Sequence, residues 1–293
     1  MRKLGLLLLL LVGAVAAIVA CGAQGFDPAS KVNSVRMFAT RVDKPYAKPG
    51  ETVTYRAFVV TPDGAIGTPA ASWAFCATPK RLTENGAVSA ACLSAGVRAI
   101  GDGPSVTAAV PADACALFGP EVTSADLRPR DPDVTGGYYQ PVRLVVHDGA
   151  STSTTAFGMT RIRCNAASAG AEAAAEYQRR YVPNQNPELL PLEASVPLDA
   201  VPAAARVTLR APWPEASVES YVAIDVAEQR VVDRRETMRL SWFATGGSFE
   251  HDRTGTPDNA WTAPSEPGTV HLFVVLRDDR GGVAFAAYSV VVR

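Results

Sequence analysis

The chain of 293 residues has a formal net charge of −1, with 28 lysines and arginines against 29 aspartates and glutamates. This balance, without a basic stripe, argues against nucleic acid as a partner. The length predicts one or two domains. The 22 prolines and 23 glycines suit an all-β body that is rich in turns.

The first 20 residues have the three parts of a secretory signal peptide. Arg2 and Lys3 precede an unbroken apolar run from Leu4 to Val19, and the small residue Ala20 follows. The alternative is an uncleaved membrane helix. A run of about 16 residues at 1.5 Å each spans about 24 Å, which is short of the ~30 Å hydrocarbon core. We therefore expect residues 1–20 to be a cleaved signal peptide.

The sequence Ile18-Val19-Ala20-Cys21 resembles the lipobox of bacterial lipoproteins. The resemblance implies that the Cys21 thiol is lipidated, that the leader is cut before it, and that the new amino terminus is acylated. Two or more acyl chains form a stable anchor, whereas one binds only marginally. Gly22 in place of aspartate favours the outer membrane by the sorting rule of enteric lipoproteins. The expected location is the bacterial cell envelope, with the protein anchored in the membrane through lipidated Cys21. The alternative is an ordinary signal peptide followed by a chance cysteine.

Four further cysteines follow, at positions 76, 92, 115 and 164. An even number in an exported protein predicts disulfide bonds. Of the three possible pairings we expect Cys76–Cys92 and Cys115–Cys164, because sequential pairs close the shortest loops. A zinc site is the rival interpretation, but the chain has no Cys-x-x-Cys and no histidine close to these cysteines. We therefore expect no metal and no cofactor.

Residues 21–32 are polar and contain glycine, which predicts a flexible tether. Residues 33–165 are expected to form a first β-sandwich domain, with turns at Lys48-Pro49-Gly50-Glu51 and Pro62-Asp63-Gly64. Alternating apolar and polar residues predict its strands. They lie near Val35–Ala39, Val53–Val59, Ser72–Cys76, Val97–Ile100, Val106–Val110, Val142–Val146 and Phe157–Cys164.

The stretch from Pro111 to Pro141 has no clean period and predicts a loop of about 30 residues, which is unusual in a compact domain. It ends in Gly136-Gly137-Tyr138-Tyr139-Gln140. Exposed tyrosines beside flexible glycines suit contact with carbohydrate or protein. Tyr138 and Tyr139 are therefore candidate binding residues, with packing onto the sheet as the alternative.

Residues 166–183 are rich in alanine, and Glu176 with Arg180 forms a favourable i,i+4 pair. We expect a short helical linker here. Residues 184–293 are expected to form a second β-sandwich domain, with a hairpin turn at Asp278-Asp279-Arg280-Gly281-Gly282. Its strands are expected near Leu189–Leu192, Val207–Leu209, Val222–Val226, Met238–Trp242, Val270–Leu276 and Val283–Val292.

Short strands separated by turns at intervals of roughly 8–12 residues favour β-sandwiches. The segments Trp242–Gly247, Trp261–Pro264, Pro267–Thr269 and Leu272–Val292 resemble the bacterial Ig-like and PKD-like repeats of surface proteins. The resemblance implies an all-β chain with two tandem Ig-like domains joined by the helical linker. A fold of this kind does not define a function.

We find no catalytic motif in the sequence: His-Glu-x-x-His, Gly-x-Ser-x-Gly and the phosphate-binding loop are all missing. The loop carboxylates Asp131, Asp133, Asp278 and Asp279 raise a minor hypothesis of calcium binding, with solvated turn residues as the alternative. We therefore expect no enzyme. The leading hypothesis is a lipid-anchored binding or display module of the envelope for a protein or glycan. The alternative is a structural accessory lipoprotein of an envelope assembly, such as a secretion or motility apparatus.

Overall fold

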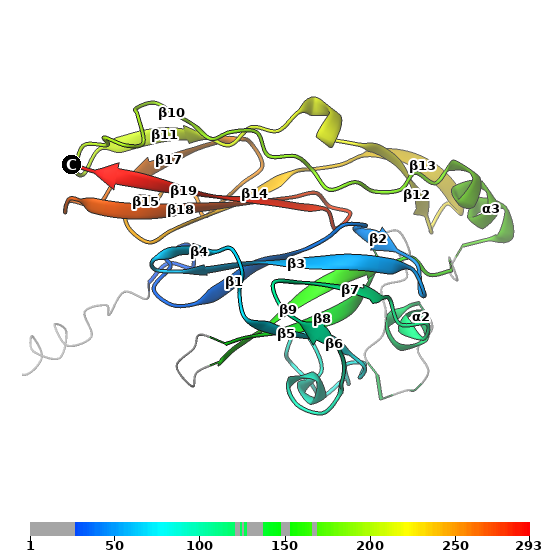
Figure 1. The fold of residues 1–293 in the computed structure, drawn as a ribbon. Coiled ribbons are helices and arrows are strands. Elements are labelled where there is room, and N and C mark those ends of the chain that lie inside the picture. Colours follow the sequence, from blue (N-terminus) through cyan, green and yellow to red (C-terminus); the bar gives the residue numbers. More distant parts are fainter. Residues whose placement is uncertain (1–26, 121–123, 125, 128–136, 148–152, 166–168) are drawn as a thin grey trace, which may run out of the picture.

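The computed structural model describes residues 27–120, 124, 126–127, 137–147, 153–165 and 169–293. The leader, Cys21, Asp131 and Asp133 lie outside the described residues. The chain is all-β apart from short helices, and its sheets are stacked in four layers (Figure 1). None of the helices in the described ranges is long and apolar enough to cross a membrane.

The first domain is a sandwich of two sheets. One sheet has the order β1 (Arg36–Val42), β3 (Thr52–Thr61) and β4 (Gly64–Ile66), with β7 (Ser105–Ala109) also paired to β3. The other has the order β2 (Tyr46–Ala47), β9 (Ser153–Ile162), β8 (Tyr138–His147), β5 (Ala71–Cys76) and β6 (Val97–Asp102). Two short helices, η1 (Ala90–Leu93) and α2 (Ala114–Phe118), lie in its connections.

The core between these two sheets contains large side chains that are at most 1% exposed, including Tyr55, Trp73, Leu144 and Ile162. The expected 31-residue loop is shorter than the sequence suggested, because it contains α2 and because β8 begins at Tyr138. The structure joins Cys76 to Cys92 with Cα atoms 5.2 Å apart, and Cys115 to Cys164 with Cα atoms 5.6 Å apart. This is the pairing expected from the sequence.

The second domain is also a sandwich. One sheet has the order β16 (Arg253–Thr254), β14 (Arg239–Ala244), β18 (Gly268–Arg277) and β19 (Val283–Val292). The other has the order β10 (Glu193–Ala194), β11 (Arg206–Arg210), β17 (Asp258–Thr262) and β15 (Ser248–Phe249). Trp242 and Trp261, both 0% exposed, fill the core between them. The strand expected near Leu189–Leu192 is wrong, since only the two residues of β10 pair with β11.

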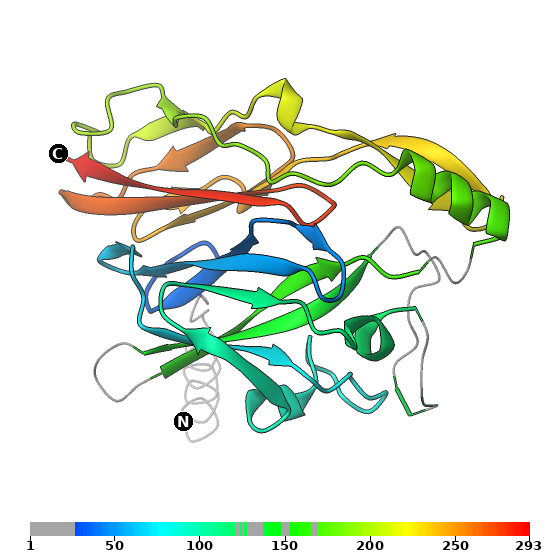
Figure 2. The same ribbon diagram turned by 45° about the vertical axis from the view of Figure 1, so that its right-hand side comes forward.

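The alanine-rich segment forms helix α3 (Ala171–Arg180), as predicted. It lies along a hairpin of β12 (Ser220–Asp225) and β13 (Arg230–Arg235), which follows the short helix η2 (Glu215–Ser217) (Figure 2). Tyr177 of the helix is 7% exposed and belongs to the same buried cluster as Val222 and Ile224 of the hairpin. The segment expected to act as a linker is therefore packed against the second domain.

A third apolar cluster joins the two domains. Phe58 of β3 stacks on Phe285 of β19 with ring centroids 4.5 Å apart, and Phe38 of β1 stacks on Phe243 of β14 at 3.7 Å. Phe273, which is 0% exposed, lies between these pairs. At Phe58, Val59 and Val60 both faces of β3 are therefore buried, one in the first-domain core and one against the second domain.

The segment before β1 is attached to the second domain. The Val32 amide donates to the carbonyl oxygen of Ala244 at 2.8 Å, and the Ala244 amide donates to that of Ser30 at 2.9 Å. Val32 is 2% exposed and belongs to the cluster between the domains. The expected flexible tether over 21–32 is therefore wrong for residues 30–32, because they find hydrogen-bond partners at the end of β14.

Candidate binding site at the domain junction

The turn between β18 and β19 is buried at the junction of the two domains. The Asp278 carboxylate, in a residue 8% exposed, accepts hydrogen bonds from the amides of Arg280 at 2.8 Å and Gly282 at 2.7 Å. A side chain at Gly282 would overlap the same carboxylate, so this position requires glycine. The alternative of a solvated turn is therefore wrong for Asp278.

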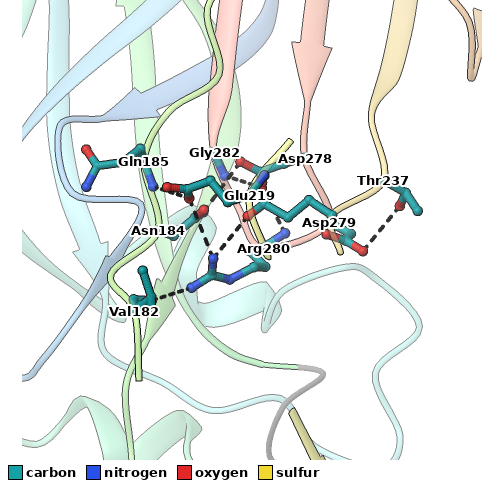
Figure 3. A network of polar contacts seen from close by, with 10 residues as sticks. Val182, Asn184, Gln185, Glu219, Thr237, Asp278, Asp279, Arg280 and Gly282 are labelled. Atoms are coloured by element: carbon teal, nitrogen blue, oxygen red, sulfur yellow. Dashed lines mark hydrogen bonds and ion pairs between the residues drawn. The ribbon is translucent and has the colours of Figure 1, made fainter. Parts of the chain in front are cut away.

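The side chain of Arg280 connects this turn to the rest of the junction (Figure 3). It is 3% exposed, and its Nη1 atom lies 3.1 Å from Glu236 Oε1 and 3.6 Å from Glu219 Oε2. Its Nη2 atom donates to the carbonyl oxygen of Val182 at 2.7 Å. The guanidinium also lies over the ring of Tyr221, 4.6 Å from its centroid. We call these residues with Asp278 the junction network.

The junction network is a structural ion-pair cluster. The guanidinium of Arg280 is the cation that faces Glu236 and Glu219, while Asp278 is occupied by backbone amides. Among the residues that the structure describes, no group of three or more histidines, cysteines, aspartates and glutamates could hold a metal ion. The described part of the chain thus gives the calcium hypothesis no support.

Burial sets the protonation of the network. Desolvation, with a smaller contribution from the nearby Asp278 charge, raises the pKa of Glu236 to about 7. Desolvation also raises the pKa of Asp278, against the hydrogen bonds from Gly282 and Arg280, which lower it. Both carboxyl groups therefore bind protons more tightly in the folded protein than in the unfolded chain.

We expect the protein to become less stable as the pH rises from about 4.5 to about 7, the interval between the ordinary pKa of Glu236 and its folded value. The stability that the proton contributes is fully present below the lower value and lost above the higher one, an effect of about 1–3 kcal/mol. Urea unfolding across this range measures it. Glu236→Gln should flatten the slope, and an unchanged slope would contradict this origin.

Next to the network, three tyrosines and two arginines form what we call the tyrosine–arginine cluster. The guanidinium of Arg161 lies 4.6 Å from the ring centroid of Tyr46, and that of Arg163 lies 3.5 Å from that of Tyr181. The rings of Tyr46 and Tyr181 meet edge to face at 5.8 Å, and Tyr177 lies 6.0 Å from Tyr181. The cluster joins β2 and the end of β9 to the segment that follows α3.

A cavity of about 410 Å³, the junction pocket, opens beside this cluster. It is lined by Tyr46, Lys48, Pro49, Glu51, Arg163, Tyr181 and Pro183. Aromatic rings offer apolar faces to a sugar ring or a side chain, and the cations offer charged donors to a carboxylate. Its volume lies within the ~300–1,000 Å³ that is common for ligand sites. The pocket is thus the candidate binding site.

The predicted binding tyrosines take different positions. Tyr138 is 5% exposed and packs in the first-domain core, so the expectation of direct ligand contact is corrected to the alternative of packing. Tyr139 points to the other face, is half-buried, and pairs across the sheet with Arg161. Gly137, at a φ of +97°, leaves room for Arg161 and the Tyr139 hydroxyl. Tyr139 thus stays a candidate at the border of the tyrosine–arginine cluster.

Sequence analysis did not identify Tyr46, Arg163 or Tyr181. Tyr46 lies in a two-residue strand and Tyr181 at the end of a helix, where no periodic pattern marks them. Tyr46 is more than 100 positions before the other residues of the cluster in the chain, and the parallel pairing of β2 with β9 brings it together with Arg161. Only the fold reveals this site.

The fold defines this chain as an all-β protein built of β-sandwich domains. No protein-family model matches it, and no curated protein is significantly similar in sequence. Similar solved structures include the D00–D0 domain of intimin, with 10% identity, a TM-score of 0.25, and coverage of 89% of this chain and 98% of that one.

Two further structures are similar to the same degree. The fibronectin(III)-like modules of CbhA from Clostridium thermocellum have 10% identity and a TM-score of 0.24, with 88% of this chain and 92% of that one covered. The Ig1–2 module of the Drosophila receptor tyrosine phosphatase DLAR has 9% identity and a TM-score of 0.24, with 89% and 100% covered. Similarity this low says nothing about ligands or partners, so the function is inferred from this chain's own residues.

Proposed function

We propose that this protein is a lipid-anchored, non-enzymatic binding or display module of the bacterial cell envelope, which meets a protein or glycan through the junction pocket. The observation that carries the proposal is the pocket itself. Two tyrosine rings and two cations, Lys48 and Arg163, surround an open space of about 410 Å³. The junction network holds the segment that contains Tyr181, because Arg280 donates a hydrogen bond to the carbonyl oxygen of the next residue, Val182.

The anchor is supported by the sequence. The lipobox-like Ile18-Val19-Ala20-Cys21 follows a signal-type leader, and the two disulfide bonds fit an exported, oxidising compartment. We propose that Cys21 is lipidated and that the protein is displayed on the outer membrane. Within the described residues, Ser30 and Val32 form backbone hydrogen bonds with Ala244, so we propose that the chain leads from the anchor to the second domain first.

The non-enzymatic part of the proposal is supported by the lack of a catalytic motif in the sequence. Two serine–histidine contacts occur among the described residues: Ser72 Oγ lies 3.4 Å from His147 Nε2, and Ser289 Oγ lies 3.2 Å from His271 Nδ1. Within the described residues neither histidine is hydrogen-bonded to a carboxylate, which a catalytic triad needs to orient its histidine.

The anchor is tested by labelling bacteria that express the full chain with radioactive palmitate. We expect label in the wild-type protein and none in Cys21→Ala, since the thiol carries the acyl chain. Cys21→Ala should also move from the membrane fraction to the soluble fraction. An unlabelled wild-type protein would contradict lipidation.

The pocket is tested by capture from intact envelopes and by a glycan array. Lys48→Gln with Arg163→Gln should weaken binding about tenfold or more, which corresponds to ~1.4 kcal/mol. The matched control is Arg234→Gln with Arg239→Gln, which makes the same charge change on exposed residues of the second domain. One stoichiometric envelope protein would favour the assembly alternative. Equal binding by both double variants would contradict the pocket.

A further inference from the structure

Two arginines lie directly opposite each other on neighbouring strands of the first domain. Arg41 of β1 is the register partner of Arg56 of β3. Like charges in this position repel and destabilise a sheet. Both side chains are exposed, and neither forms an ion pair or hydrogen bond with any residue that the structure describes. The fold thus holds two cations together without a counter-charge of its own.

These arginines line a cavity of about 480 Å³ at the seam between the domains, which we call the seam pocket. They belong to the same face of their strands as Phe58 and Ala39, which is the face turned toward the second domain. The remaining wall is mainly apolar and includes Ile66 and Phe285. A ligand here meets two positive charges at one end and hydrophobic side chains at the other.

The second-domain wall of the seam pocket is the edge strand β19. The Val291 amide donates outward to Leu198 at 2.8 Å, and the Val283 amide donates outward to Asn186 at 2.9 Å. Because backbone groups alternate along an antiparallel strand, the amides and carbonyls of Phe285 and Ala287 also point outward. Within the described residues no hydrogen bond occupies them.

The open part of β19 lacks the usual protection of an edge strand. Between Val283 and Val292 there is no proline, no lysine and no bulge in the register with β18. Such features normally keep an edge from pairing with another chain. The small side chains of Ala286 and Ala287 leave the approach to the backbone uncrowded.

We propose that the seam pocket takes an extended acidic segment of a partner protein, which adds a strand to the open edge of β19. Its backbone pairs with Phe285 and Ala287, and one of its carboxylates lies between Arg41 and Arg56. Strand addition supplies affinity through backbone hydrogen bonds, and the arginine pair selects the charge. The inference rests on the proposed binding function, and it names a protein partner, but it does not depend on the junction pocket.

An acidic peptide fits these observations better than a small free anion. A strand of about five residues spans ~17 Å and places alternate side chains on one face. That face can meet Phe58, Ile66 and Phe285 while a neighbouring carboxylate reaches the arginines. A free anion would use the charges but leave the apolar wall and the backbone edge without partners.

The test is a random octapeptide library panned on the full-length protein in detergent. We expect the enriched peptides to share an aspartate or glutamate within alternating β-branched or aromatic residues. Arg41→Gln with Arg56→Gln should weaken the best peptide about tenfold or more. The control Arg234→Gln with Arg239→Gln should leave binding unchanged. If no peptide is enriched, or if both double variants bind equally well, the proposal is overturned.

Strand addition is tested separately from the charge. Ala287→Pro removes an outward amide without removing a bond to β18, and proline is tolerated on edge strands. It should weaken the peptide about tenfold. N-methylation of the peptide amides that face β19 should abolish binding, and N-methylation of the amides that face away should not. This comparison uses the wild-type protein and is independent of the stability of Ala287→Pro. Uniform tolerance of N-methylation, or full competition by inorganic phosphate, would show an anion site instead. Envelope capture through the junction pocket is unaffected by any of these outcomes.

Discussion

Arg280→Met is expected to lower the free energy of unfolding by about 3–5 kcal/mol at neutral pH, the typical cost of removing one partner from a buried ion pair. The variant leaves Glu236 and Glu219 without the guanidinium that faces them, at a side chain that is 3% exposed in the wild type. The carbonyl oxygen of Val182, in the segment after α3, also loses the hydrogen bond that Arg280 donates to it. Urea unfolding of both proteins measures the loss.

Two comparisons make this prediction specific. The loss should be smaller at about pH 5, where Glu236 takes up a proton and no longer needs a counter-charge. The matched control is Arg235→Met, whose guanidinium forms a 2.9 Å ion pair with Glu215 at the surface. An exposed pair contributes about 0–1 kcal/mol. If Arg235→Met is as damaging as Arg280→Met, burial is not the cause.

Phe58→Ala is expected to cost about 3–5 kcal/mol, as do other truncations of buried phenylalanines. Phe58 is 5% exposed, stacks on Phe285 and meets Phe273 edge to face at 6.0 Å. These partners belong to the other domain, so the variant weakens the contact between domains more than the core of either one. Calorimetry should therefore show one transition in the wild type and two in the variant.

The control for Phe58→Ala is Leu93→Ala, because Leu93 is 59% exposed. An exposed leucine contributes little to stability, and we expect a change within about 0.5 kcal/mol. A single transition in Phe58→Ala, shifted to lower temperature, would mean that the domains unfold together for reasons other than this cluster.

Secondary-structure elements and disulfide bonds that depend on a local sequence pattern could be predicted from the sequence. The alternation in Val53–Val59 and Val142–Val146 predicted β3 and β8, and the alanine-rich run predicted α3. The disulfide pairing followed from loop length alone. In each case the physical cause lies within a few residues or in the chain entropy of one loop.

Features that depend on the two domains together could not be predicted. Phe58-Val59-Val60 departs from strict alternation because Phe58 and Val60 face the second domain while Val59 faces the first-domain core. The alternation predicted a strand with one buried face, and nothing in it identified a second sheet on the other face. The aspartates of the Asp278–Gly282 turn looked like ordinary turn residues, because burial of Asp278 comes from a segment almost 100 residues earlier.

The binding residues were the hardest part of the site to predict. Tyr138 and Tyr139 were selected for their glycine neighbours, yet strand alternation directs one of them into the core. Tyr46, Arg163 and Tyr181 had no local signal, since their association depends on a parallel pairing and on the path after α3.

The pairing of residues 30–32 with β14 determines how the molecule responds to a pulling force. In a string of tandem domains, tension on one end passes through each domain in turn. Here the segment at Val32 and the last strand, through Val201 and Arg293, are both held by the second domain. A pull along the chain before residue 30 is therefore borne first by the hydrogen bonds to Ala244. Until they break, a force between this segment and the second domain does not pass through the first domain or its junction pocket.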